Sequence, residues 1–342
     1  MSLFPFTSTQ ITESADARDY VPDESIDLVV TSPPYPMIEM WDSVFESMNA
    51  DIPSYIGSDS YTAFELMHKE LDKVWKSCTE ACTEGGIVAI NIGNATRSTD
   101  DLGFTLFHNR ERIVEWFTSN GYTLLPSIIW KKPTNKPNSY LGSGCLPTSQ
   151  YAVNDHEYIL LFRKGDRRDF EPKSERRYRS AYFYHERNDW FSGEWDLKGE
   201  SQQLESVDRD VTAAFPLEVP YRLIQMYSIY DDTVYDPFGG TGTTQLASLV
   251  SGRNSVGIDI DLSFKDVVTK RLFENAQDIA LSKSQERLAK QKERDMDEMN
   301  YKSEEYDVRV KTKKEKRLLL QGISDISQLD SHIEATHVKY KD

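Results

Sequence analysis

The stretch DLVVTSPPY, residues 27–35, runs from an apolar segment straight into a turn that contains two prolines. The segment from Ile26 to Val30 is mostly apolar, as is typical of a buried strand. The prolines remove two backbone donors and stiffen the turn, and the first of them pushes Ser32 toward an extended conformation. The turn therefore holds the Ser32 hydroxyl and the Tyr35 ring in a fixed relation. Ligand sites in open α/β sheets lie at strand ends, so this turn is the first candidate for a functional site.

Strand and helix patterns alternate along the chain beyond this turn. Strands are predicted over Asp27–Thr31, Ile87–Ile92, Thr123–Trp130, Glu157–Phe162, Thr233–Tyr235 and Ser255–Ile258. Helices are predicted over Tyr61–Thr83, Leu106–Asn120 and Leu217–Tyr227. The second helix is closed by Gly121 and the third is opened by Pro216, which are typical positions for these residues. The alternation predicts an α/β domain with a largely parallel sheet.

A second turn, DPFGGTGTT at residues 236–244, follows another short predicted strand. Its three glycines allow the backbone to approach a ligand closely at the start of a helix. Asp259 ends the next predicted strand, where a carboxylate can hold the two hydroxyls of a ribose. The pattern differs from the dinucleotide fingerprint GxGxxG. Each feature alone is also ordinary turn chemistry, but their order favours an adenosine-containing ligand.

Length and composition are those of a globular protein. The 342 residues suffice for one large domain or two ordinary ones, and 38% are hydrophobic against 28% charged. No segment approaches the roughly 20 consecutive apolar residues of a membrane span. The first residues, MSLFPFTSTQITESAD, lack the basic and apolar regions of a signal peptide. Three cysteines, Cys78, Cys82 and Cys145, give no disulfide framework, so we expect a reducing, cytoplasmic setting.

The distribution of charge matters more than its sum. The formal net charge of −16 argues weakly against a nucleic-acid partner, because phosphate binding needs Lys and Arg. Residues 163–187 are nevertheless locally basic, and aromatic side chains are interleaved with the cations. Such a segment is either a solvated loop or an insertion that contacts phosphates and probes bases. The residues alone leave both interpretations open.

Together the two turns resemble those of the amino-methylating DNA methyltransferases, which use S-adenosylmethionine. That family combines an (S/D/N)PP(Y/F) catalytic turn with an FxGxG cofactor turn. Here SPPY spans Ser32–Tyr35 and FGGTG spans Phe238–Gly242, an order that is similar to the β-type permutation of the family. The segments GGIVAINIGN, IIWKKP, EYILLF and FPLEVPYRLI also resemble family segments in their order. The resemblance covers roughly residues 20–275. The stretch DVTAAFP departs from it, because many relatives carry a His-Pro pair shortly before the Phe-Pro.

This resemblance implies a fold and a division of the chain. The fold is α/β, a Rossmann-like S-adenosylmethionine-dependent methyltransferase sheet that is circularly permuted and carries an inserted target-recognition region. The implied division is 1–162 for the catalytic half, 163–205 for the target-recognition insert, 206–275 for the cofactor-binding half and 276–342 for a charged C-terminal extension. Within the extension, residues 284–299 have the charge pattern of a solvated helix.

The resemblance also assigns site residues. The catalytic turn consists of Ser32, Pro33, Pro34 and Tyr35. The residues expected to contact the cofactor, S-adenosyl-L-methionine, are Thr31, Phe215, Pro216, Asp236, Pro237, Phe238, Gly240, Gly242, Thr243 and Asp259. The residues expected to contact DNA are Arg176, Arg177, Arg179, Lys131 and Lys132. No metal is expected, because Cys78 and Cys82 lack a second Cys or His pair at zinc-site spacing.

The chemistry of a base amine explains what such a turn can do. The lone pair of the exocyclic amine is delocalised into the ring, so the amine is a poor nucleophile. Acceptors such as the Ser32 hydroxyl and the Pro33 carbonyl can orient the nitrogen and favour charge developing on it. Tyr35 offers a ring for stacking, and the base must leave the duplex to reach it. Positioning supplies much of the rate, since no strong base is evident.

Serine at the first position of the turn resembles the enzymes that methylate cytosine at N4, whereas aspartate or asparagine is more usual for adenine N6. We therefore expect a sequence-specific N4-cytosine methyltransferase of double-stranded DNA, working in a restriction–modification system. An N6-adenine enzyme of the same fold and a non-catalytic nucleic-acid-binding protein are the alternatives. An oxidoreductase is a further one, although nothing around Ser32 suggests hydride chemistry. A homodimer and a monomer both fit the resemblance, and no membrane partner is expected.

Overall fold

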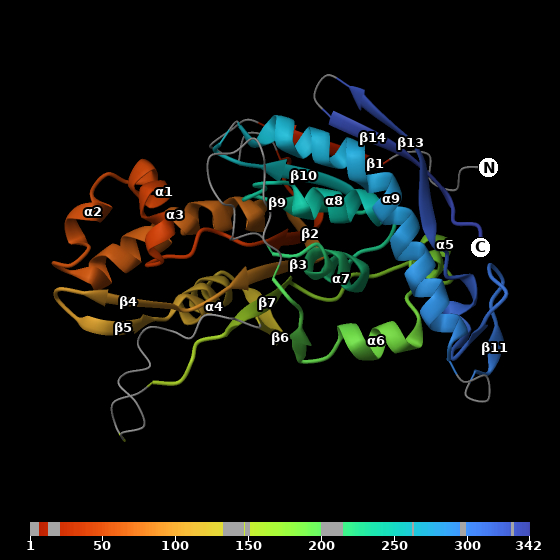
Figure 1. The fold of residues 1–342 in the computed structure, drawn as a ribbon, viewed down its shortest axis with the longest axis horizontal. Helices are drawn as coiled ribbons and strands as arrows, with labels where there is room; N and C mark the ends of the chain where they lie inside the picture. Colours follow the sequence, from red (N-terminus) through yellow and green to blue (C-terminus); the bar gives the residue numbers. More distant parts are fainter. Residues whose placement is uncertain are drawn as a thin grey trace.

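A ten-stranded sheet forms the centre of the described part of the protein. The computed structural model describes residues 7–12, 21–132, 147, 151–199, 215–261, 263–294, 299–329 and 332–342. The order of the strands across the sheet is β13-β14-β1-β10-β9-β2-β3-β7-β6-β8. Figure 1 shows this sheet with helices packed along it.

The elements agree closely with the sequence patterns. The strands are β1 (Thr7–Thr12), β2 (Ile26–Thr31), β3 (Cys82–Ile92), β4 (Ala95–Thr99), β5 (Gly103–Phe107), β6 (Tyr122–Lys131), β7 (His156–Lys164), β8 (Glu194–Asp196), β9 (Thr233–Asp236), β10 (Asn254–Ile258), β11 (Tyr301–Lys302), β12 (Arg309–Val310), β13 (Gln321–Leu329) and β14 (His332–Lys339). The helices are α1 (Asp42–Met48), α2 (Ile52–Tyr55), α3 (Ser60–Ala81), α4 (Asn109–Ser119), α5 (Glu175–Arg179), α6 (Tyr184–Trp190), α7 (Glu218–Tyr227), α8 (Thr243–Val250) and α9 (Phe264–Lys292), with 3₁₀ turns η2 (Glu39–Trp41) and η4 (Lys313–Arg317). All six predicted strands and all three predicted helices are confirmed. The second predicted helix begins three residues later than expected, because Gly103–Phe107 pairs with β4 as a hairpin.

The sheet is mostly parallel at its centre. Strands β1, β10, β9, β2 and β3 run parallel to one another. On one side β7 is antiparallel to β3 and β6 is antiparallel to β7, with β8 parallel to β6, and on the other side β14 is antiparallel to β1 and β13 is antiparallel to β14. The carboxyl ends of β2, β3, β9 and β10 therefore meet at one edge, which we call the carboxyl edge. Their amino ends meet at the opposite edge, which we call the amino edge. Because β7 runs the other way, it begins at the carboxyl edge.

Side chains of β3 alternate between two hydrophobic cores, as the pleat of a strand requires. Val88 and Ile90 pack in a core with α3 and α4, whereas Ile87 and Ala89 pack in a second core with α7, α8 and α9. The protein is thus a three-layer structure with helices on both faces of the sheet. Among the described residues, no helix is both long enough and apolar enough to span a membrane.

The C-terminal part of the chain is more integrated than the sequence predicted. Strands β13 and β14 extend the main sheet beyond β1. Helix α9 passes through the predicted boundary at residue 276 without a break, and its later turns bury Ser284, Arg287, Leu288 and Gln291. The helix predicted over 284–299 is confirmed as far as Lys292, with the expected i,i+4 pair between Glu286 and Lys290, but the prediction that it is solvated is wrong for the side that carries these buried residues. The physical reason is that α6 and the C-terminal residues cover them and form a third apolar cluster with Leu288.

Candidate active site

The two sequence motifs lie side by side at the carboxyl edge. Strands β2 and β9 pair in parallel, so the proline-rich turn after β2 and the glycine turn after β9 leave the sheet together. One carboxylate joins them: Thr31 Oγ1 donates to Asp236 Oδ1 at 2.6 Å, and Thr244 Oγ1 donates to Asp236 Oδ2 at 2.6 Å. Both oxygens of Asp236 are thus occupied by protein donors. In this structure Asp236 fastens the two turns to each other.

The donors around Asp236 are neutral groups. They are the two threonine hydroxyls and the backbone N–H of Phe238, at 3.1 Å, and no cation pairs with Asp236 in the part of the chain that the structure describes. Burial raises the pKa of Asp236 to about 6, because the neutral donors only partly offset the loss of water. Burial therefore favours the folded protein most when this carboxyl is protonated, whereas the hydrogen bonds from the two hydroxyls favour its charged form.

The proline-rich turn is held from behind by buried amide and imidazole groups. Asn109 Nδ2 donates to the carbonyls of Pro36 at 3.1 Å and Gly93 at 3.0 Å. His68 Nε2 lies 3.0 Å from Asn109 Oδ1, and burial lowers the pKa of His68 to about 3, so the ring is neutral. The turn ends at Met37, which is buried with a positive φ of 66°. These contacts fix the position of the turn relative to α3 and α4.

Ser32 and Tyr35 belong to a hydrogen-bonded group that includes two residues not predicted from the sequence. Tyr35 OH donates to Glu157 Oε2 at 2.9 Å and lies 3.4 Å from Ser32 Oγ. Asn91 Nδ2 donates to Tyr35 OH at 2.8 Å and to Glu157 Oε2 at 2.7 Å. Asn91 interrupts the apolar run at the end of β3, and Glu157 lies at the start of β7, so both are at the carboxyl edge. A polar residue in an apolar strand at this edge was the sequence signal that could have identified each of them.

The glycine turn is shaped by its backbone and by Asp259. Gly240 N donates to Asp259 Oδ2 at 2.8 Å, and Asp261 N donates to Asp259 Oδ1 at 2.9 Å. Gly242 has a φ of +77°, and a Cβ there would lie 2.6 Å from a side-chain carbon of Val268. Both facts require glycine at this position. Because Gly242 has no side chain, the turn packs closely against α9, and α8 begins directly after it.

The remaining residues predicted to contact a cofactor border the same turn. Phe238 packs edge-on to Trp75, with ring centroids 5.8 Å apart. Arg271 Nη1 donates to Thr243 Oγ1 at 2.9 Å and so ties α9 to the start of α8. Phe215 is buried just before α7, and Pro216 and Pro237 are buried as well. The structure brings the predicted cofactor residues of the two turns together, with Phe215 in the core beneath α7.

The geometry at Asp259 fits an adenosine-containing ligand. Each carboxylate oxygen accepts one backbone N–H, which leaves further lone pairs for hydroxyl groups. Burial raises the pKa of Asp259, and Asp259 pairs with no cation among the described residues. A carboxylate next to a glycine turn that opens a helix can hold a ribose diol, as the sequence predicted. No cluster of three His, Cys, Asp or Glu side chains that could hold a metal occurs in the described ranges.

The predicted DNA contacts divide between the two edges of the sheet. Lys131 and Lys132 end β6 at the carboxyl edge. Lys131 Nζ pairs with Glu194 at 2.5 Å on the surface, and Lys132 pairs with Glu157 while it lies 4.3 Å from the ring centroid of Trp130. Both lysines therefore lie on the side of the molecule that carries the proline-rich turn.

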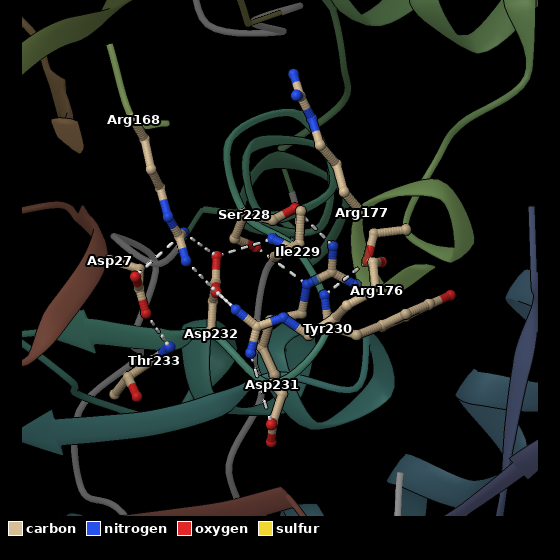
Figure 2. Close-up of polar contacts among 12 residues, drawn as sticks. Asp27, Arg168, Arg176, Arg177, Ser228, Ile229, Tyr230, Asp231, Asp232 and Thr233 are labelled. Atoms are coloured by element: carbon tan, nitrogen blue, oxygen red, sulfur yellow. Dashed lines mark hydrogen bonds and ion pairs between the residues drawn. The ribbon is translucent and has the colours of Figure 1, made fainter. Parts of the chain in front are cut away.

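The three predicted arginines lie at the amino edge, together with Arg168. Arg168 Nη1 and Nη2 donate to the two oxygens of Asp232 at 2.6 and 2.9 Å, and Arg176 Nη2 donates to Asp232 Oδ1 at 3.4 Å. Figure 2 shows these guanidinium groups converging on Asp232, whereas the Arg177 side chain points away. Arg177 stacks on Phe170 instead, at 4.4 Å from the ring centroid.

This placement does not support the predicted DNA contact of these arginines at the catalytic turn. Asp232 immediately precedes β9, and so it lies at the end of the sheet opposite to Asp236. Arg179 pairs with Glu175, its neighbour on α5, at 2.8 Å. Figure 1 shows α5 at the end of the molecule away from α1 and α2. Carboxylates within the protein, which no local pattern revealed, neutralise Arg176 and Arg179.

Some predicted features lie outside the described residues. They are Cys145, the final residues 200–205 of the predicted insert, and residues 210–214 of the stretch DVTAAFP. The described cysteines Cys78 and Cys82 are fully buried.

The chain matches known DNA methyltransferases over most of its length. A family model for N6 and N4 methyltransferases, described as DNA methylase, matches residues 26–270. The Type II methyltransferase M.MthZI of Methanothermobacter thermautotrophicus is 44% identical over 316 residues, which cover 90% of this chain and 88% of that protein. The Type II methyltransferase M.MjaI of Methanocaldococcus jannaschii is 46% identical over 271 residues, 75% of this chain and 89% of that protein.

Solved structures agree with these sequence relatives. A putative DNA modification methylase of Thermus thermophilus, TTHA0409, was solved in complex with S-adenosyl-L-methionine. It superposes with a TM-score of 0.59 and 26% identity over 78% of this chain and 93% of that one. The PvuII DNA methyltransferase, which is cytosine-N4-specific, superposes with a TM-score of 0.58 and 15% identity over 82% of this chain and 93% of that one. The second likeness, at its low identity, concerns the fold alone.

Proposed function

The chain belongs to the DNA methylase family whose model spans residues 26–270, and from this premise we propose that it transfers a methyl group to the N4 amine of cytosine within a specific DNA sequence. The observation that carries the proposal is the meeting of the SPPY turn and the glycine turn, joined through Asp236, at one edge of the sheet. A site for the base and a site for the methyl donor thereby lie next to each other.

The protein's own residues bind and orient the base. Ser32 Oγ is the acceptor for one hydrogen of the target amine, and the Pro33 carbonyl is the second acceptor. Two acceptors rotate the amine so that its lone pair leaves the plane of conjugation and becomes available for attack. The ring of Tyr35, which is largely buried beside Ser32, stacks on the flipped base. As the nitrogen–methyl bond forms, the bond between the methyl carbon and the donor's positively charged sulfur breaks, and the donor leaves as a neutral thioether. The methylated amine then releases one proton to water.

The methyl donor is S-adenosyl-L-methionine, which supplies a methyl group bonded to a positively charged sulfur. Asp259 would hold its ribose hydroxyls, and the backbone of Phe238–Gly242 would lie against it at the start of α8. Structural support comes from TTHA0409, which superposes on this chain and was solved with that molecule. Thr31 and Asp236 contribute by keeping the donor turn beside the base turn.

Serine at the first position of the turn supports cytosine N4 over adenine N6. A serine hydroxyl is small and neutral, and SPPY resembles the N4-cytosine enzymes of the family. The names of the relatives M.MthZI and M.MjaI, both Type II methyltransferases, support a protective role in a restriction–modification system. A homodimer is compatible with this role, and the described residues favour neither a dimer nor a monomer.

Double-stranded DNA would approach the carboxyl edge. Lys131 and Lys132 lie there, and so does the end of β8, because Asp196 pairs in register with Lys131. Among the described residues of the predicted recognition insert, the residues from β8 onward are thus the part that lies near the flipped base. The earlier part, with α5, lies at the amino edge. We therefore propose that the described residues from Glu194 to Gly199 take part in target recognition, and we assign the amino-edge arginines a structural role.

Mass spectrometry of nucleosides tests the proposal. Unmethylated plasmid DNA of diverse sequence is incubated with the protein and S-adenosyl-L-methionine, digested and analysed for methylated nucleosides. N4-methylcytosine is the expected product, and sequencing of the modified positions gives the target. N6-methyladenine would overturn the assignment of the base while leaving the arrangement of the site intact. No methylated nucleoside on any DNA tested would overturn the proposed activity.

A further inference from the structure

Glu157 has no role in the function proposed above, yet it accepts hydrogen bonds from two members of the proline-rich turn's hydrogen-bonded group, Tyr35 and Asn91. Its Oε2 accepts from Tyr35 OH at 2.9 Å and from Asn91 Nδ2 at 2.7 Å. Its Oε1 pairs with Lys132. A largely buried carboxylate that is held on both oxygens has a fixed position and accepts hydrogen bonds without donating any.

This acceptor sets the direction of every hydrogen bond around it. The phenol of Tyr35 has one hydrogen, and Glu157 takes it. The phenol oxygen can then only accept, and Asn91 Nδ2 donates to it at 2.8 Å. Ser32 Oγ, at 3.4 Å, is left to donate its own hydrogen toward that oxygen. Ser32 Oγ also accepts from Asn91 Nδ2 at 3.4 Å. With its hydrogen turned inward, the Ser32 oxygen therefore keeps one lone pair to present outward.

A hydroxyl that presents lone pairs is what the target amine requires. If the phenol hydrogen pointed to Ser32 instead, Ser32 would direct its own hydrogen at the amine, and two donors would face each other. The polarity of the chain from Ser32 through Tyr35 to Glu157 therefore decides whether Ser32 accepts from the base or opposes it.

The surroundings keep this polarity in place. Burial and the Glu157 carboxylate raise the pKa of Tyr35 well above its usual value, so the phenol keeps its hydrogen at neutral pH. Gly93 leaves room for the group: a Cβ there would lie 3.2 Å from the Tyr35 ring and 3.3 Å from Glu157 Cγ. Lys132 supplies the charge that balances Glu157 in a partly buried position.

We propose that Glu157 is a positioning residue of the methyl transfer, which acts through Tyr35 and orients the Ser32 hydroxyl as an acceptor for the target amine. The inference rests on the proposed function, because it concerns the same turn and the same base. Asn91 and Lys132 hold Glu157 in place, and Glu157 itself does not touch the substrate.

The substitution Glu157→Gln tests the direction of the hydrogen bonds from Ser32 through Tyr35 to residue 157 without changing the size of the side chain. Glutamine has the size of glutamate, but its amide can donate to the phenol oxygen and turn the phenol hydrogen toward Ser32. We expect kcat to fall on the order of 10- to 100-fold, as for other lost polar contacts in active sites. The KM for DNA and the dissociation constant of S-adenosyl-L-methionine should change less than about twofold.

A double-mutant cycle separates orientation from mere packing. Tyr35→Phe removes the hydroxyl through which Glu157 acts on Ser32, so adding Glu157→Gln to it should cause no further loss of kcat. Glu305→Gln is the matched control, because Glu305 is a partly buried carboxylate paired with Lys339 at 2.8 Å, far from the turn. This control should keep the activity of the unmodified protein.

The outcomes distinguish this inference from the proposed function. If the unmodified protein methylates DNA and Glu157→Gln matches it in kcat, the positioning role is wrong while the activity stands. An equal loss from Glu157→Gln with and without the Tyr35 hydroxyl would also overturn it, because Glu157 would then act independently of Tyr35. Failure of the unmodified protein to methylate any DNA would overturn the proposed function itself.

Discussion

Two aspartates flank the four-residue strand β9 and experience opposite environments. Asp232 precedes the strand at the amino edge, where Arg168 and Arg176 neutralise it and Ile229 N donates to it at 2.9 Å. Asp236 ends the strand at the carboxyl edge, where two hydroxyls and a backbone N–H donate to it. Both side chains are almost completely buried.

Under the proposed function, this difference separates an edge with a structural role from the edge that holds the site. At the amino edge, Arg168 and Arg176 are neutralised by Asp232, and Arg177 stacks on Phe170. At the carboxyl edge, Asp236 and Asp259 pair with no cation among the described residues and accept from neutral hydroxyl and backbone donors. Asp259 keeps further lone pairs that the hydroxyls of a ligand could use. A cluster of arginines in a sequence therefore does not by itself mark the DNA-binding face. The predictions below test this contrast, from the largest expected effect to the smallest.

Ser32→Ala should affect catalysis and leave folding intact. The variant loses the amine acceptor, so we expect kcat to fall about 10²- to 10³-fold, equivalent to about 3–4 kcal/mol of transition-state stabilisation. Binding of S-adenosyl-L-methionine should be unchanged. Single-turnover methylation and calorimetric titration measure the two quantities. If Ser32→Ala methylates DNA at the normal rate, Ser32 is not the acceptor for the target amine.

Asp232→Ala should affect folding and leave catalysis intact. It leaves Arg168 and Arg176 without their shared carboxylate partner, so we expect the free energy of unfolding to fall by about 3 kcal/mol. Urea denaturation measures the loss, and kcat per folded molecule should stay near normal. Glu175→Ala, which breaks the surface pairs of Glu175 with Arg179 and Arg317, is the control and should cost less than about 1 kcal/mol. Equal losses in both variants would contradict the contrast between buried and exposed pairs.

Asp236 should make stability depend on pH. Its folded-state pKa is raised to about 6, above the roughly 4 of an unfolded aspartate. A raised pKa means that the protonated form favours the folded state. The contribution is therefore fully present below about pH 4 and is lost as the pH rises through about 6.

We expect the unfolding free energy, relative to Asp236→Asn, to fall by about 2–3 kcal/mol between pH 4 and pH 7. The variant cannot titrate at this position, so the difference between the two proteins isolates the carboxyl group. Urea denaturation at several pH values measures it. A difference that is constant with pH would show that the surrounding hydroxyls solvate the charge fully.

Asp259→Ala should weaken cofactor binding moderately. It removes the acceptor for the ribose hydroxyls, and we expect about a tenfold higher dissociation constant for S-adenosyl-L-methionine, or about 1.4 kcal/mol. Asp261→Ala serves as the control, since Asp261 is exposed on the same loop. If Asp259→Ala binds S-adenosyl-L-methionine with unchanged affinity, Asp259 does not hold the ribose hydroxyls.

Arg177→Gln should have the smallest effect. Arg177 lies at the amino edge and points away from the ion-paired cluster (Figure 2), so neither DNA affinity nor its dependence on salt should change. Lys131→Gln, at the carboxyl edge, should lower the slope of log affinity against log salt by about one. A reduced slope for Arg177→Gln would instead indicate that DNA binds at the amino edge.

Local patterns determined much of this protein. The apolar runs, the glycine and proline turns and the order of SPPY before FGGTG predicted the main strands, the helices and a site at strand ends. These features depend on residues within a few positions of one another. Local periodicity and turn chemistry describe such short-range relations well.

Only the tertiary structure decided which charges meet. Glu157 reaches Tyr35 across 122 positions, and Arg168 reaches Asp232 across 64. The order and direction of the strands set these contacts, and neither is encoded in a local pattern. The same positive charge therefore serves as a structural partner at one edge, and at the other it can face DNA. The reason is that burial and the nearest carboxylate, rather than residue type, decide what a charged side chain is free to bind.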